Sequence, residues 1–306
     1  MSNGKITDTI YRIDAKVFGL NNFTSVYLIK GEKSAIIDSG ANVSAPFILN
    51  GMKKYGFDPN NISYIIITHI HLDHGGGAGT LIKEMPKAKV VVHGNGAMHM
   101  IDPSKLVNSS KRVFGDRIDE WYGDVLPIRE DRIIPIKDGE TIDLGKGQVL
   151  SMIDSPGHAN HHICVYSEKE KVLFTGDAAG VYIPNAEVVI PTTPPPEFDP
   201  DININTIKGF LGLDLKRLLF SHFGSVRRVS ETLNSSIDWL LKWKNTTSEI
   251  MSRGGSLEEI IEKFRADTRE ALGSSKGAGS FYNWVMEHHI PMCAFGYFNY
   301  FDKKAE

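Results

Sequence analysis

The chain has 306 residues, of which 41% are hydrophobic and 23% are charged, and its formal net charge at pH 7 is −3. This balance is ordinary for a globular protein and excludes a surface built to coat nucleic acid. The sequence shows no secretory leader, no apolar stretch near the roughly 20 residues that cross a bilayer, and no disulfide framework. We therefore expect a cytoplasmic protein with a small-molecule substrate and neither a nucleic-acid nor a membrane partner.

The first half of the chain predicts strands that alternate with short turns and helices. Ser44 and Pro46 mark the start of a helix that ends near residue 55. A short helix is expected at about 77–84, and residues 95–130 predict a mixture of helix and loop. Runs of β-branched and aromatic residues predict the strands. These strands lie at 9–15, 24–30, 34–40, 62–68 and 88–94.

A second series of strands follows, and the last part of the chain predicts helices. Beyond Val229 apolar residues recur at helical spacing, and Ser256 with Glu259 forms a capping box that begins another helix. Residues 274–280 predict a flexible break. We therefore expect a catalytic domain at 1–228 and a helical C-terminal extension at 229–306 that packs on it. The second strand series lies at 131–137, 147–153, 161–167, 171–177 and 215–224, with a helix at 201–213.

The segment THIHLDHGGG, residues 68–77, places three histidines and an aspartate directly behind an apolar strand. His69 and His71 are two residues apart, so in extended backbone their side chains project to the same side. Asp73 and His74 follow where three glycines allow a tight turn. These nitrogen and oxygen ligands suit zinc, iron or manganese better than calcium, and they can begin two adjacent metal sites.

Three later strands each end in another strong metal ligand. His158 follows a strand and a Pro-Gly turn, Asp177 follows a strand that ends in Thr-Gly, and His222 follows the last strand. Chemistry in α/β proteins usually lies at strand ends. We therefore expect these three side chains to complete the metal shells that residues 68–77 begin.

The ordered pattern HxHxDH, Pro-Gly-His, Thr-Gly-Asp and Ser-His resembles that of the metallo-β-lactamase-fold hydrolase superfamily over about residues 8–225. The spacing, with the segments PTTPPPEFD and LLFSHFG, looks most like the glyoxalase-II-like branch and its prokaryotic, largely archaeal hydrolases. The resemblance implies an α/β fold, a four-layered αββα sandwich with the metals at one edge of two sheets. The helices after residue 228 would then be an extension of that sandwich.

The resemblance also implies seven ligands for two divalent metal ions, with zinc as the first choice and iron or manganese as alternatives. A hydroxide that bridges the ions is the expected nucleophile, because two cations lower the pKa of a shared water. Asp177 bridges the ions and Asp73 orients the hydroxide, so both count as catalytic. His162 matches the second histidine of the family's GHTPGH segment and is expected to support the ligands from behind. The first ion takes His69, His71 and His158, and the second takes Asp73, His74 and His222.

The predicted function is a binuclear hydrolase of ester-type bonds, namely a thioesterase, lactonase or phosphoesterase. The glyoxalase-II resemblance favours a thioester, but the basic residues that bind glutathione in that branch have no clear match. One alternative on the same scaffold is a persulfide dioxygenase with a single iron ion. Another is an RNA-processing phosphodiesterase, although the basic arm that grips RNA is not seen. A non-catalytic binding module is the third.

Tyr182 and Phe23 are the candidates for contact with the substrate. Tyr182 begins a proline-rich segment, residues 182–198, that either forms a wall of the pocket or covers a sheet edge. His288 and His289 are interpreted as an ordinary pair at a helix end, and the aromatic residues after them as core or subunit interface of a homo-oligomer. The C-terminal helices are expected to close one side of the pocket or to form that interface.

Overall fold

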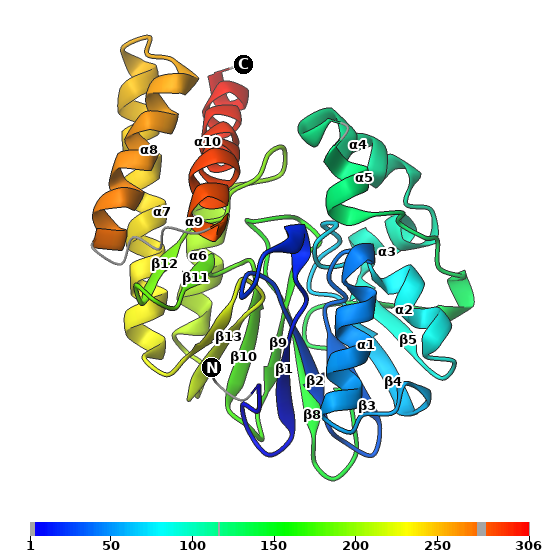
Figure 1. Ribbon diagram of the computed structural model, residues 1–306. Helices are drawn as coiled ribbons and strands as arrows, with labels where there is room; N and C mark the ends of the chain where they lie inside the picture. Colours follow the sequence, from blue (N-terminus) through cyan, green and yellow to red (C-terminus); the bar gives the residue numbers. More distant parts are fainter. Residues whose placement is uncertain (1–3, 116, 274–279, 306) are drawn as a thin grey trace.

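The computed structural model describes residues 4–115, 117–273 and 280–305, and two six-stranded sheets form its centre (Figure 1). The first sheet has the order β1-β2-β3-β4-β5-β6, in which β3 to β6 are parallel. Parallel strands that are buried on both faces need continuous apolar runs, and the run at 62–67 supplies one. The strands are β1 (Ile10–Asp14), β2 (Ser25–Ile29), β3 (Ser34–Ile37), β4 (Ile62–Ile66), β5 (Lys89–His93) and β6 (Ile133–Ile136).

The second sheet has the order β14-β13-β10-β9-β8-β7 and packs face to face on the first. One buried cluster contains residues of both sheets, such as Tyr27 and Ile66 from the first and Val165, Phe174 and Leu219 from the second. This cluster is the centre of the sandwich. The strands are β7 (Thr141–Asp143), β8 (Val149–Asp154), β9 (Ile163–Ser167), β10 (Val172–Gly176), β13 (Arg217–Phe220) and β14 (Gly224–Val226).

Helices cover the outer face of each sheet and complete the four layers. Residues of the helices on the first sheet share a second buried cluster with its strands, for example Ile48 with Ile36 and Leu81 with Val90. These helices are α1 (Ala45–Lys54), α2 (Ala78–Glu84), α3 (Gly94–Ile101), α4 (Ser104–Phe114) and α5 (Arg117–Tyr122). Single 3-10 turns lie at η1 (Val17–Gly19), η2 (Asn42–Ser44), η3 (Pro59–Asn61) and η4 (Glu130–Arg132).

The helices of the second sheet include the C-terminal extension. Trp243 and Tyr297 of the extension share one buried cluster with Leu218 and Phe220 of β13, so both parts have a common core. The first helix of the extension, α7, begins at Val229, directly after the predicted boundary at residue 228. The division of the chain into two domains stays a prediction. The helices are α6 (Pro200–Phe210), α7 (Val229–Ser252), α8 (Leu257–Leu272), α9 (Ser280–Trp284), the π-helical turn η6 (Val285–His289) and α10 (Ile290–Ala305).

The fold confirms the predicted αββα sandwich with a helical extension. The expected mixture of helix and loop at 95–130 contains three short helices. The proline-rich segment begins with a hairpin that the sequence did not indicate, formed by β11 (Val181–Ile183) and β12 (Val188–Ile190). Half of the predicted capping box forms, since Ser256 Oγ accepts the Glu259 N–H at 3.3 Å. The predicted break at 274–280 falls almost wholly outside the described residues. Within the described part, every helix is too short or too polar to cross a bilayer.

Candidate metal centre

All seven predicted metal ligands meet at one edge of the two sheets. The loop after β4 carries four of them, and the others follow β8, β10 and β13, one each. Because both sheets end here, side chains separated by more than 140 positions in the sequence become neighbours. Their ligand atoms form three overlapping groups in which all atoms lie within 4.8 Å of one another. The groups are His69–His71–His158, His69–His74–Asp177 and Asp73–His74–His222.

Asp177 lies between the two halves of this cluster. Its Oδ2 is 3.6 Å from His158 Nε2 and 3.9 Å from His69 Nε2. Its Oδ1 is 3.4 Å from His74 Nε2 and 3.5 Å from His222 Nε2. Each carboxylate oxygen thus faces a different set of imidazoles, which is the arrangement that a ligand bridging two ions needs.

Several polar atoms of the cluster are buried without a hydrogen-bond partner. Among the described residues, His69 Nε2 and Asp177 Oδ1 accept no hydrogen bond, although such groups normally have a partner when they are buried. His74 Nε2 and His222 Nε2 lie 3.2 Å apart. Imidazole and carboxylate lone pairs that converge in this way fit divalent cations of the zinc type. The residues present therefore fit two metal ions.

Hydrogen bonds from behind orient three of the histidines. His158 Nδ1 lies 2.9 Å from the Thr192 carbonyl oxygen and His222 Nδ1 lies 3.4 Å from that of Phe23. His74 Nδ1 lies 3.0 Å from a carboxylate oxygen of Asp38. A carbonyl or carboxylate oxygen only accepts, so Nδ1 carries a proton and Nε2 is the ring atom that faces the cluster and can bind a metal.

Asp38 is the residue of this site that the sequence did not reveal. It is fully buried directly after β3, with φ at 61°. Its Oδ1 accepts the backbone N–H and the hydroxyl of Thr68, both at 2.9 Å, and its Oδ2 accepts the Ser221 hydroxyl at 2.8 Å as well as His74. Asp38 thereby ties both sheets to the metal cluster. The available signal was an aspartate at a strand end, followed by Ser-Gly.

His162 lies behind the cluster, where it was predicted. Its Nε2 accepts the backbone N–H of Asp177 at 3.0 Å. Gly176 makes this approach possible, because a Cβ there would lie 2.4 Å from His162 Nε2. The imidazole therefore fixes the backbone that presents the bridging carboxylate.

Burial and mutual charge set the protonation states of the cluster. Burial, followed by the charge of His158, lowers the pKa of His71 to about 3. Burial opposes ionisation of Asp73, but His74 and His222 outweigh it and lower the pKa of Asp73 to about 2. Both groups are thus in the deprotonated forms that bind metal at neutral pH.

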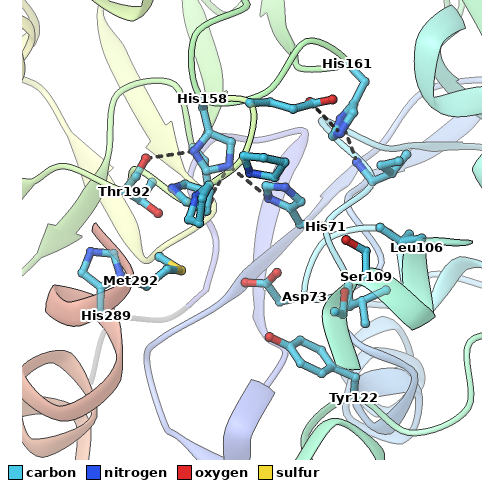
Figure 2. A pocket seen from close by; sticks show the side chains of 18 of the residues that line it. His71, Asp73, Leu106, Ser109, Tyr122, His158, His161, Thr192, His289 and Met292 are labelled. Atoms are coloured by element: carbon cyan, nitrogen blue, oxygen red, sulfur yellow. Dashed lines mark hydrogen bonds and ion pairs between the residues drawn. The ribbon is translucent and has the colours of Figure 1, made fainter. Parts of the chain in front are cut away.

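The cluster opens into a cavity of about 560 Å³ (Figure 2). His71, Asp73 and His158 lie at its floor, and Tyr122 from α5 points its hydroxyl toward Asp73. The C-terminal extension closes one side, as predicted. It does so through Trp284, His288, His289 and Met292.

The two predicted substrate contacts differ in their placement. Phe23 lines the cavity, and its ring stacks on that of His222 with centroids 4.6 Å apart. Tyr182 is not among the described lining residues. Its ring stacks on Phe220 and its backbone N–H donates to the His222 carbonyl at 2.6 Å. The geometry therefore gives no support to a substrate contact by Tyr182, since β11 directs its ring toward the core.

His288 and His289 lie at the end of η6, as expected, and both also line the cavity, which the sequence did not indicate. His289 is buried, and its Nε2 donates to the Pro191 carbonyl oxygen at 2.8 Å. The neighbouring carbonyl, that of Thr192, is the one that orients His158. The C-terminal extension thus contacts, through His289, the same segment whose Thr192 carbonyl orients the predicted metal ligand His158.

We expect His289→Ala to weaken binding of the first metal ion by less than the 10- to 100-fold typical of losing a direct hydrogen bond to a ligand, because His289 acts through the Pro191 carbonyl beside Thr192. Zinc titration of the metal-free protein against a chromophoric chelator measures this change. Phe295→Ala is the matched control, since Phe295 lies in the following helix, α10, and is 43% exposed. Equal zinc affinity in both variants would contradict the coupling.

The profile of the Metallo-beta-lactamase superfamily matches residues 20–222, so the chain belongs to this superfamily. The metallo-beta-lactamase fold-containing protein ST1585 of Sulfurisphaera tokodaii is 33% identical over 71% of this chain and 79% of its own length. Its crystal structure matches with a TM-score of 0.70 over 95% of this chain and 98% of that chain. The glyoxalase-II-like branch stays a prediction.

Two further relatives carry names that describe their chemistry. The acyl-coenzyme A thioesterase MBLAC2 of Gallus gallus is 27% identical over 55% of this chain and 62% of its own length. The flavo-diiron protein FprA2 of Clostridium acetobutylicum is 26% identical over 52% of this chain and 34% of its own length. Members of this superfamily that resemble the chain thus include a hydrolase and a diiron protein.

Proposed function

We propose that this protein is a binuclear metal-dependent hydrolase that cleaves an ester-type bond in a small molecule. The observation that carries the proposal is the position of Asp177, whose two oxygens face two separate sets of ligands. If the site held a single ion at the other group of ligands, the converging side chains of Asp73, His74 and His222 would bind no metal. The thioesterase relative supports hydrolysis of an ester-type bond.

Each half of the cluster would hold one divalent ion, proposed to be zinc, with iron as the alternative that the diiron relative suggests. When bound, such a pair supplies a Lewis acid and a water that ionises near neutral pH. Asp73 is the ligand carboxylate with the larger exposure, 16% against 4% for Asp177. It would therefore be the carboxylate better placed to accept a hydrogen bond from a water held by the ions and to orient it toward the substrate.

The walls of the cavity position the substrate and exclude bulk water. The buried phenol of Tyr122 keeps its proton, because burial and the charge of Asp73 raise its pKa. Tyr122 therefore presents a protonated phenol to the cavity beside Asp73. The expected cytoplasmic location and homo-oligomeric state stay predictions.

Removal of metal is expected to abolish hydrolysis and to lower the melting temperature by about 10 °C. An ion present at 100 times its Kd stabilises the folded state by about 2.7 kcal/mol, and two ions act here. Elemental mass spectrometry should find about two ions per chain. Dialysis against a chelator, followed by zinc, tests the loss and recovery of activity on thioesters, lactones and aryl phosphoesters.

Two outcomes of this experiment would contradict the proposal. One is a single iron per chain with a second site that stays empty when zinc or manganese is offered. That result would favour the persulfide dioxygenase, which sulfite production would identify. The other is full occupancy by two ions without turnover of any of the three substrate classes.

A further inference from the structure

One wall of the cavity is built from aromatic rings of three distant segments, and we call it the aromatic wall. Phe18 is its centre, with ring centroids 5.0 Å from Trp284, 5.1 Å from Trp121 and 5.3 Å from Tyr122. Phe23 lies 4.4 Å from Trp284 and also contacts the ring of His222. All five rings line the cavity. An apolar surface thus begins at a predicted metal ligand and extends outward.

The loop before β2 adopts an unfavourable backbone to present this wall. Lys16, Phe18 and Asn22 all have φ between 52° and 57°, a region that residues with a side chain seldom adopt. Such strain persists only where the surrounding structure holds it, and it gathers at binding and catalytic sites. Here the strained backbone places Phe18 between α5 and α9.

Part of the cavity lining is polar, and we call it the polar side. Figure 2 shows His161 and Ser109 there, across from His289 and Met292 of the C-terminal extension. Asn160 belongs to the same polar side. Its backbone and side-chain N–H groups donate to Glu197 at 3.1 and 2.9 Å.

The charges of the lining disfavour a substrate with several phosphates. Among the described lining residues Lys105 is the only lysine, and there is no arginine. Apart from Asp73 and Asp177, whose charge two bound ions would offset, the acidic residue in this described lining is Glu197. Recognition of phosphate groups normally uses several arginine or lysine side chains, or a helix N-terminus with exposed N–H groups. An uncharged substrate fits this lining better.

We propose that the aromatic wall is a subsite for an apolar, uncharged acyl group, which it binds next to the metal cluster. The substrate is then a neutral ester or thioester whose acyl chain lies on the wall and whose other part faces the polar side. This inference rests on the proposed function. It also predicts that the enzyme does not recognise the phosphate groups of coenzyme A.

Binding without turnover tests the subsite directly. Acetohydroxamic and octanohydroxamic acids share a metal-binding head and differ by six methylenes. Each buried methylene tightens binding about fourfold, so burial of three makes the octano compound about 60-fold tighter. Isothermal titration of the zinc-loaded protein measures both values of Kd. Equal affinities would overturn the proposal.

Substitutions in the aromatic wall test whether this wall causes the difference between the two hydroxamate affinities. Trp284→Ala is expected to reduce the ratio of the two affinities about tenfold, and Phe18→Leu to reduce it less, because it keeps an apolar side chain. Phe295→Ala should keep the ratio, since this exposed residue lies outside the cavity. An unchanged ratio in folded Trp284→Ala would exclude the wall as the binding surface.

Turnover separates the subsite from the proposed function. We expect kcat/KM to be at least tenfold higher for p-nitrophenyl octanoate than for the acetate. It should also be higher for the octanoyl thioester of N-acetylcysteamine than for octanoyl-coenzyme A. A preference for the coenzyme A thioester would overturn the neutral substrate class. If no ester is cleaved but the hydroxamate ratio holds, the proposed function fails and the subsite stands.

Discussion

Asp177→Ala is expected to lose both metal ions and to lower kcat/KM by about a thousandfold or more, the scale of metal-assisted activation of water. The reason is geometric, because each oxygen of this carboxylate faces a different half of the cluster. Removal of an ordinary ligand should empty one half, whereas removal of Asp177 weakens both. Elemental analysis and activity measured on the same preparation check this result.

Two comparisons make the Asp177 experiment specific. Asp214→Ala removes a carboxylate that is 70% exposed and paired with Lys171, and it should keep both ions and full activity. His222→Ala removes a ligand from one half only and should retain about one ion. Two ions per chain in Asp177→Ala would contradict the bridging role.

Replacement of Asp38 should have the second large effect. Asp38→Ala leaves four donors without an acceptor, those of the Thr68 backbone and hydroxyl, Ser221 and His74. Breaking a buried charged network of this kind typically costs about 3–5 kcal/mol. Urea unfolding of the metal-free protein measures the loss of the free energy of unfolding.

Asp38→Asn separates the contribution of Asp38 to stability from its contribution to metal binding. Asparagine tolerates the positive φ at this position, and its oxygen can still accept from Thr68. Its amide nitrogen then faces His74 Nδ1 and donates to it, which moves the imidazole proton to Nε2, the predicted ligand atom. We expect a smaller loss of stability but about 10- to 100-fold weaker binding of the second ion. Wild-type zinc affinity in Asp38→Asn would show that Asp38 does not set this tautomer.

The prediction of the sandwich succeeded where the signal was local. The run at 62–67 is apolar at every position but Ser63 and Tyr64. In the structure this run forms β4, which lies between the parallel strands β3 and β5. His69 and His71 lie beyond the end of β4, in the loop, and their ligand atoms nevertheless belong to one converging group. Strand ends were also informative, because the fold brings the ends of both sheets to one edge.

The sequence by itself therefore determined the strand-rich halves and the ligands at strand ends, since period and strand ends are properties of short segments. The layered fold was implied by the resemblance of its motifs to a known family. Only the tertiary structure decided how that edge is completed. Phe18 meets Trp284, and Asp38 meets Ser221, across more than 180 intervening positions. His289 reaches the metal site through the Pro191–Thr193 segment rather than through its own neighbours. No local pattern marks such contacts, because they arise only when separate elements pack together.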